Sequence, residues 1–124
     1  MNREWFLDYI ATYNADKSGL SRFYAPDLVF ENAAMTLAGD ALGAFFQSLH
    51  GVISDRIEPV RLVVDEDGAA LLGKHVFTAL QDADLPIGAM KTGESKSLVL
   101  FAFYETKADR ITRIRLTYWP DGRA

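Results

Sequence analysis

The 124-residue chain contains no cysteine, which excludes disulfide bonds, thiolate metal sites and cysteine nucleophiles. It has 13 Lys and Arg residues against 17 Asp and Glu, and a net charge of −4 does not favour binding to nucleic acid. No apolar run approaches the roughly 20 residues needed to cross a membrane, and the first residues lack the pattern of a signal peptide. We therefore expect a cytoplasmic protein that binds neither nucleic acid nor membrane.

The sequence also lacks the patterns of metal and phosphate sites. Only two histidines are present, His50 and His75. One inward-facing histidine without a companion carboxylate falls short of the three protein ligands that are typical of catalytic zinc. The glycines do not have the spacing of a phosphate-binding loop. We expect no metal and no cofactor.

The hydrophobic pattern predicts one α+β domain over residues 1–124. Helical spacing of apolar residues appears in the first part of the chain, and period-two alternation follows to the end. Helices first and strands afterwards are typical of a sheet with helices on one face. The expected helices cover residues 3–14, 20–24 and 40–53, the strands cover 28–32, 57–66, 69–81, 93–106 and 110–119, and turns fall at 65–68, 86–88 and 107–109.

His75 lies in an apolar run, residues 69–79, that has the pattern of a strand. Alternation places its ring on the same face as Leu71 and Phe77. If that face lines a cavity, a neutral imidazole there could act as a base. If the face is packed, His75 is a core histidine that bonds a backbone carbonyl and has no further role.

The strand expected at residues 93–106 is apolar on both faces. Val99 and Phe101 alternate with Leu98 and Leu100. A sheet that is apolar on both sides needs cover on both sides, and the helices can cover only one. We expect a second copy of the chain to cover the other, which gives a homodimer through the convex face of the sheet.

Several short sequence segments, each weakly specific by itself, follow one another along nearly the whole chain. They are residues 9–14 with Asp16, residues 23–32, Gly39 before Phe45 and Phe46, Gly93 with Glu94, and residues 111–115. In these segments the chain resembles the nuclear transport factor 2-like superfamily, and within it the SnoaL-like branch of polyketide cyclases, ketosteroid isomerases, limonene epoxide hydrolases and scytalone dehydratases. The resemblance implies a curved, mostly antiparallel sheet wrapped around the N-terminal helices as a cone-shaped barrel, with an apolar pocket for a small hydrophobic molecule.

The resemblance also implies which side chains reach the pocket. His75 would move a proton, while Tyr9 and Asn32 would hold the negative charge that develops on a substrate oxygen. Asn32 could instead belong to a turn, and Tyr13 and Tyr118 to the core. The residues expected to contact the substrate are Tyr13, Phe30, Phe45, Phe46, Phe77, Val99, Phe101, Leu116 and Tyr118.

Departures from the family patterns narrow the expected activity. Asn32 stands where ketosteroid isomerases have a carboxylate base, and Leu116 stands where epoxide hydrolases need an aspartate. Scytalone dehydratases, with pocket histidines and tyrosines, are the closest chemical analogy, although we expect His50 to be exposed or near a helix end. We expect a cofactor-independent enzyme that acts by proton transfer on a small hydrophobic carbonyl or hydroxyl compound, as an isomerase, cyclase, dehydratase or lyase. The alternative, favoured by the lack of a pocket carboxylate, is a non-catalytic ligand-binding or dimerisation module.

Overall fold

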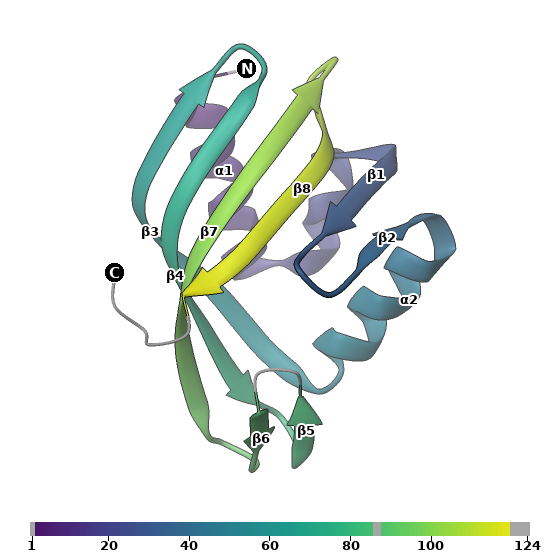
Figure 1. Ribbon diagram of the computed structural model, residues 1–124, viewed down its shortest axis with the longest axis vertical. Helices are drawn as coiled ribbons and strands as arrows, with labels where there is room; N and C mark the ends of the chain where they lie inside the picture. Colours follow the sequence, from purple (N-terminus) through teal and green to yellow (C-terminus); the bar gives the residue numbers. More distant parts are fainter. Residues whose placement is uncertain (1, 86–87, 120–124) are drawn as a thin grey trace.

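Two α-helices and a strongly curved sheet form the molecule, which confirms the expected α+β class (Figure 1). The computed structural model describes residues 2–85 and 88–119. In chain order its elements are α1 (Arg3–Ala15), the 3-10 helix η1 (Lys17–Arg22), β1 (Tyr24–Glu31), β2 (Thr36–Ala38), α2 (Gly39–His50), β3 (Ile53–Asp65), β4 (Gly68–Ala79), β5 (Ala83–Leu85), β6 (Gly88–Met90), β7 (Ser95–Lys107) and β8 (Arg110–Trp119).

The main sheet has six strands in the order β2-β1-β8-β7-β4-β3. Neighbouring strands are antiparallel, except that β1 and β8 run parallel. Because β2 and β3 lie at opposite edges of this order, the curved sheet that the resemblance implied is open and does not close into a complete barrel. A separate two-stranded ribbon, β5 with β6, lies below the far ends of β4 and β7 in Figure 1.

The predicted helices and strands are present in the expected order and differ mainly at their ends, while the short strands β2, β5 and β6 were not predicted. The last strand occupies residues 110–119 as expected, and its turn from β7 places Ala108 and Asp109 at positive φ of 51° and 60°, as in a two-residue hairpin. Part of the expected turn at 86–88 lies outside the described residues. The strand expected from residue 57 begins four residues earlier, at Ile53, because the third helix already ends at His50.

A register shift divides β3 between Pro59 and Arg61. Before the shift Ile53 and Ile57 are buried, and after it Leu62 is buried. One extra residue in a strand moves all later side chains to the opposite face. The inward positions of β3 therefore change from odd to even numbers at this bulge.

α1 packs against the concave face of the sheet and lies behind it in Figure 1. Phe6, Tyr9 and Ile10 are its buried residues, and they form one core with Phe23 and residues of β4, β7 and β8. Burial of each such side chain stabilises the fold by roughly 1.5–3 kcal/mol. α2 lies beside β1 and β2, next to the part of the concave face that α1 leaves uncovered.

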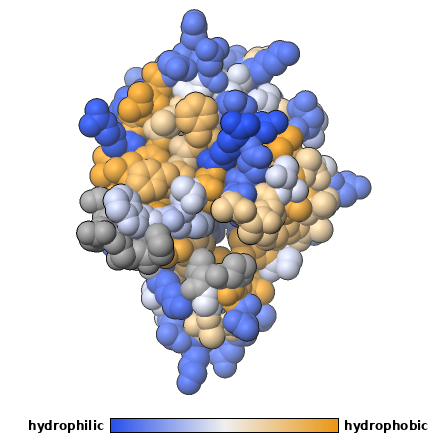
Figure 2. Space-filling model, in the orientation of Figure 1, coloured by the Kyte–Doolittle hydropathy of each residue, from blue (hydrophilic) through white to orange (hydrophobic). Residues whose placement is uncertain are grey.

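The convex face of the sheet is apolar and exposed. Phe103 is 52% exposed and Val63 is 55% exposed, and with Phe101 and Leu72 they line a shallow groove of about 530 Å³. Figure 2 shows apolar residues gathered across the middle of this face, beside a strongly hydrophilic group. In residues 2–85 and 88–119 no helix is long and apolar enough to cross a membrane.

Candidate active site

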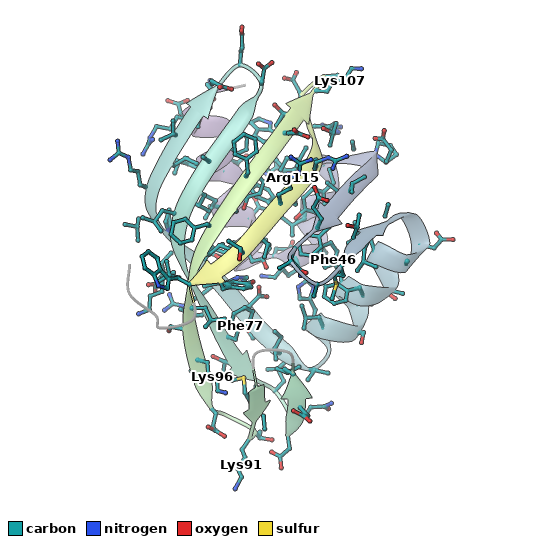
Figure 3. The ribbon with its side chains drawn as sticks, in the orientation of Figure 1. Phe46, Phe77, Lys91, Lys96, Lys107 and Arg115 are labelled. Carbon is teal, nitrogen blue, oxygen red and sulfur yellow. The ribbon has the colours of Figure 1, made fainter. Side chains whose placement is uncertain are left out.

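A cavity of about 170 Å³ lies between α2 and the concave face of the sheet. One part of its wall is apolar and largely aromatic, formed by Phe30, Phe45, Phe46, Phe77, Leu116 and smaller apolar neighbours. Figure 3 labels two of these rings, Phe46 on α2 and Phe77 on β4. The polar side chains of the wall are Tyr13, Asn32, His50, Asp55, His75 and Tyr118.

Asp55 and His75 are the two buried polar or charged residues of the described chain, with 6% and 5% exposure. They come from neighbouring strands, β3 and β4, and the Nε2 atom of His75 lies 2.6 Å from Oδ2 of Asp55. Two buried groups in such contact are strongly coupled, because little water is present to screen them. The expectation that no carboxylate accompanies His75 is therefore wrong.

The charge on Asp55 determines which nitrogen of His75 carries the proton. Burial raises the pKa of Asp55, but hydrogen bonds from His75 and Tyr13 and the charges of His75 and Lys17 outweigh burial and hold it at about 2. The ionised carboxylate can only accept hydrogen bonds, so Nε2 of His75 must donate. In the neutral ring this leaves Nδ1 as an acceptor, and Nδ1 lies 3.1 Å from the hydroxyl of Tyr118.

Three side chains thus form a hydrogen-bonded chain, Asp55–His75–Tyr118, along the wall of the cavity. Burial, and then the charge of Asp55, raise the pKa of Tyr118, so its hydroxyl keeps its proton at neutral pH. A hydroxyl has one hydrogen and two lone pairs, and it can therefore bond His75 and a ligand at once. Tyr118 was expected only to contact the substrate, and the structure places its hydroxyl in hydrogen-bond contact with His75.

Tyr13 and Lys17 hold Asp55 from the N-terminal helices. The Tyr13 hydroxyl donates to Oδ2 of Asp55, and burial together with the charge of Asp55 raises the pKa of Tyr13. The Lys17 ammonium donates to the backbone carbonyls of Tyr13 (2.6 Å) and Asp55 (2.8 Å) and lies 3.4 Å from Oδ1 of Asp55. A cation fixed beside the carboxylate lowers the cost of keeping that charge buried.

The amide of Asn14 fixes the strand that carries Asp55. Its Nδ2 donates to the carbonyl of Ile57 (2.8 Å), and its Oδ1 accepts from the N–H of Ile57 (2.7 Å). β3 is an edge strand, so these backbone groups have no partner strand on their outer side. α1 therefore replaces the missing strand at this point and aligns Tyr13 with Asp55.

His50 ends α2 and lies near the carboxylate oxygen of Asp55 that His75 does not contact. Its ring stacks on Phe46 with centroids 5.9 Å apart, and its Nε2 lies 3.7 Å from Oδ1 of Asp55. Burial lowers the pKa of His50, and the nearby Asp55 opposes this only in part. His50 is near a helix end, as expected, but its side chain is 26% exposed and lines the cavity.

Tyr9 does not reach the cavity. Tyr9 is only 2% exposed, and its hydroxyl bonds the hydroxyl of Tyr24 at 2.9 Å inside the core. Tyr9 and Tyr13 are one helical turn apart on the same face of α1, and Tyr13 is the one that reaches the site. The expected catalytic position of Tyr9 is therefore wrong.

Val99 and Phe101 are also misplaced by the sequence pattern. His75 is paired with Leu98, and Leu72 is paired with Phe101. Directly paired residues share a face of the sheet, so Leu98 faces the cavity side with His75, while Phe101 faces outward. Val99 is buried but shares the outward face of Phe101. The alternation in β7 was assigned to the wrong face because both faces are apolar.

Asn32 lines the cavity, as expected, but it also organises a turn. Its Oδ1 accepts the N–H groups of Ala34 (2.8 Å) and Met35 (3.0 Å). The side-chain oxygen of Asn32 therefore already accepts hydrogen bonds from the backbone of the turn between β1 and β2. The other expected lining residues that reach the cavity are Tyr13, Phe30, Phe45, Phe46, His75, Phe77, Leu116 and Tyr118.

Sequence reasoning missed Asp55, although the sequence contains a signal for it. Ile53, Asp55 and Ile57 alternate with polar Ser54 and Arg56, which indicates a strand with a carboxylate on its apolar face. A strand expected to begin at residue 57 leaves this alternation out. Among the described residues no three His, Cys, Asp or Glu side chains are grouped so that they could hold a metal ion.

Comparison with known proteins agrees with this fold. The model of the SnoaL-like domain matches residues 4–114, and the chain belongs to this family. A candidate polyketide cyclase from Pseudomonas putida is similar over 96% of this chain and 92% of its own, with a TM-score of 0.79 and 21% identity. No curated protein matches the sequence.

Two further solved structures have the same nuclear transport factor 2-like fold. AclR from Streptomyces galilaeus, a candidate hydroxylase, has a TM-score of 0.76 and 16% identity, and the match covers 97% of this chain and 90% of that one. A candidate SnoaL-like polyketide cyclase from Shewanella denitrificans has the same TM-score and identity, over 97% and 91% of the two chains. Identities this low show a common fold, and the chemistry has to be argued from the site.

Proposed function

We propose that this protein is an enzyme that transfers a proton on a small, hydrophobic carbonyl or hydroxyl compound, in an isomerase, cyclase, dehydratase or lyase reaction. The observation that carries the proposal is the chain Asp55–His75–Tyr118, which joins an ionised carboxylate to a hydroxyl in the wall of an apolar cavity. A mostly apolar cavity with a few convergent polar groups is typical of a ligand site.

In the base direction, neutral His75 accepts the Tyr118 proton at Nδ1 while the Tyr118 oxygen removes a proton from the ligand. The imidazolium that results lies 2.6 Å from the Asp55 carboxylate, which stabilises its positive charge. In the acid direction the same steps run in reverse, and Tyr118 returns a proton to the ligand. A positioned acid–base group of this kind contributes roughly 10²–10⁴-fold to a rate.

The size of the cavity limits the ligand. At about 170 Å³ it is close to the roughly 150 Å³ apolar cavity that holds one benzene molecule. The aromatic residues of the wall favour a flat, neutral ring, and the polar end would bond one carbonyl or hydroxyl group. We therefore propose a substrate with a single ring, smaller than the fused-ring products that the word polyketide suggests.

Solvent exchange tests the proposal whatever product the reaction gives. A panel of single-ring ketones and hydroxyketones is incubated with the protein in D₂O, and deuterium in the recovered compounds is measured by mass spectrometry. We expect at least one compound to gain deuterium next to its carbonyl, and His75→Asn to lower that rate by about 100-fold or more. Leu7→Ala, at an exposed position of α1, serves as the control and should exchange as the wild type does.

A compound that raises the melting temperature of the wild type but gains no deuterium would favour the non-catalytic ligand-binding module. Equal exchange rates in wild type and a folded His75→Asn variant would refute the proposed role of His75. Circular dichroism of each variant establishes that it is folded before its rate is compared.

A further inference from the structure

His50 lies between two different cavities. It lines the apolar cavity described above, and it also lines a second hollow of about 330 Å³ on the other side of Asp55. The second hollow is more polar, because Asn14, Asp16, Lys17 and Ser54 contribute to its wall. Asp55 thus has an apolar cavity on one side and a more polar hollow on the other, and Asp55 and His50 are in both walls.

The carboxylate presents one oxygen to each side. Oδ2 of Asp55 accepts from His75 and Tyr13. Oδ1 is buried and has no hydrogen-bond partner, and its nearest charged or titratable neighbours are Lys17 Nζ at 3.4 Å and His50 Nε2 at 3.7 Å. A buried carboxylate oxygen without a partner is costly unless it has a use or a water partner.

Of the groups around Oδ1, His50 is the one suited to pass a proton on. Lys17 is held by two backbone carbonyls, and the Tyr13 proton is held by Oδ2. Asp16, in the wall of the second hollow, accepts from the backbone and side chain of Ser18. A neutral imidazole has one donor and one acceptor nitrogen, so it can accept a proton on one side while it releases another on the other.

We propose that His50 exchanges protons between Asp55 and the solvent of the second hollow, so that substrate and proton reach the Asp55–His75 pair from opposite sides. This role rests on the proposed function, since it serves the same acid–base pair. In the outward direction, imidazolium His75 gives its Nε2 proton to Oδ2 of Asp55, and a turn of the carboxyl group brings that proton to Nε2 of His50. The Nδ1 proton of His50 then leaves to water, so each group returns to its starting charge, while each ring carries its proton on the other nitrogen. In the inward direction the same steps run in reverse and restore the starting tautomers of both rings. The 3.7 Å gap is within the range that a small ring rotation or one bridging water closes.

The exchange can be measured without any substrate. In protein labelled with ¹⁵N-histidine, the Nε2 proton of His75 is observed by NMR, and its rate of exchange with water is compared between wild type and variants. We expect His50→Gln to slow this exchange by about tenfold, and added imidazole to restore it. Ser48→Ala, an exposed change on the same helix, should leave the rate unchanged.

The direction of the change separates this role from a structural one. Loss of packing at residue 50 would loosen the site and speed up the exchange, whereas loss of a proton carrier slows it. His50→Phe, which keeps a ring on Phe46, provides a second variant in case His50→Gln does not fold, and it should also slow the exchange. An exchange rate equal to or faster than that of wild type in a folded His50 variant would overturn the proposal. Because no substrate is used, this result is independent of whether the deuterium test of the proposed function succeeds.

Discussion

Asp55 and His75 meet diagonally across the β3–β4 ladder. Asp55 is paired with Phe77 and His75 with Ile57, yet Oδ2 and Nε2 are 2.6 Å apart. Diagonal neighbours on one face of an antiparallel pair are within reach of long side chains, so the contact follows from the register of the two strands. The geometry of the site is therefore fixed by the sheet rather than by a loop.

Replacement of Asp55 by asparagine should reduce the deuterium exchange by about 100-fold or more while keeping the shape of the side chain. The amide is neutral, so it no longer stabilises the imidazolium of His75 and no longer fixes its tautomer. Exchange rate and circular dichroism are measured on the same sample. A folded Asp55→Asn protein with the wild-type rate would remove Asp55 from the mechanism.

Tyr118→Phe and Tyr9→Phe form a matched pair, because each removes one hydroxyl that bonds another side chain. Tyr118 bonds His75 at the cavity, and its loss should lower the exchange rate by about 10-fold or more with little change in stability. Tyr9 bonds Tyr24 in the core, and its loss should cost about 1 kcal/mol of unfolding free energy and leave the rate unchanged. The opposite pattern would restore Tyr9 as the catalytic tyrosine.

Asp55 should make the protein sensitive to acid in a defined range. Its pKa is about 2 in the folded protein and near 3.9 in an unfolded chain, so the ionised form is favoured by folding. The contribution, about 2 kcal/mol, is complete above roughly pH 4 and is lost as the pH falls towards 2. Urea unfolding of wild type and Asp55→Asn over pH 2–6 measures it.

The difference between the two unfolding curves isolates this residue, since the other carboxylates are the same in both proteins. We expect the stability difference to shrink as the pH falls from about 4 to about 2. A constant difference over the whole range would show that the charge of Asp55 is not stabilised in the folded state.

Phe46→Ala should change the size of ligand that the protein accepts. The ring of Phe46 forms part of the cavity wall from α2, and its removal enlarges the apolar part of the cavity. We expect two-ring ketones to raise the melting temperature of the variant more than that of the wild type. Leu7→Ala, at an exposed position of α1, is the control. An unchanged preference for single-ring compounds would contradict the proposed binding mode.

The exposed apolar residues of the convex face lead us to predict a dimer. Phe101 and Phe103 are large apolar residues exposed near its centre, and contiguous apolar patches on a protein surface are typical of interaction sites. We expect the wild type to sediment as a dimer and Phe103→Lys to sediment as a monomer in analytical ultracentrifugation. Leu7→Lys, on the other side of the molecule, should leave the dimer intact. A wild type that is monomeric at every concentration would refute the prediction.

The sequence predicted the fold well because helical and period-two spacing are local properties. The positions of His75, Phe77 and Tyr118 followed from alternation within single strands together with the family resemblance, which indicated the face that lines the pocket. Alternation failed for Phe101, because β7 is apolar on both faces and only its pairing with β4 decides between them. It could not separate Tyr9 from Tyr13 either, because one helical turn changes the position along the sheet but not the helix face.

The alternation of residues 53–57 places Asp55 on an apolar face, but only the pairing between strands makes this the same face as that of Leu62. Counted backwards by twos from Leu62, its position falls on the outward face, and only the extra residue at the β3 bulge turns it inward. A bulge is a property of the pairing between two strands, and the sequence of one strand does not show where it falls.

The same bulge makes the pairing of two strands at one position a determinant of chemistry. If β3 kept its present length and paired with β4 without the bulge, with Leu62 still in the core, its first half would turn over by one residue. The carboxylate of Asp55 would then point into solvent, and Ser54 or Arg56 would take its place beside the imidazole. Within this scaffold, a slip of one residue in strand pairing, far from any ligand, is enough to separate proteins that share a shape from proteins that share a reaction.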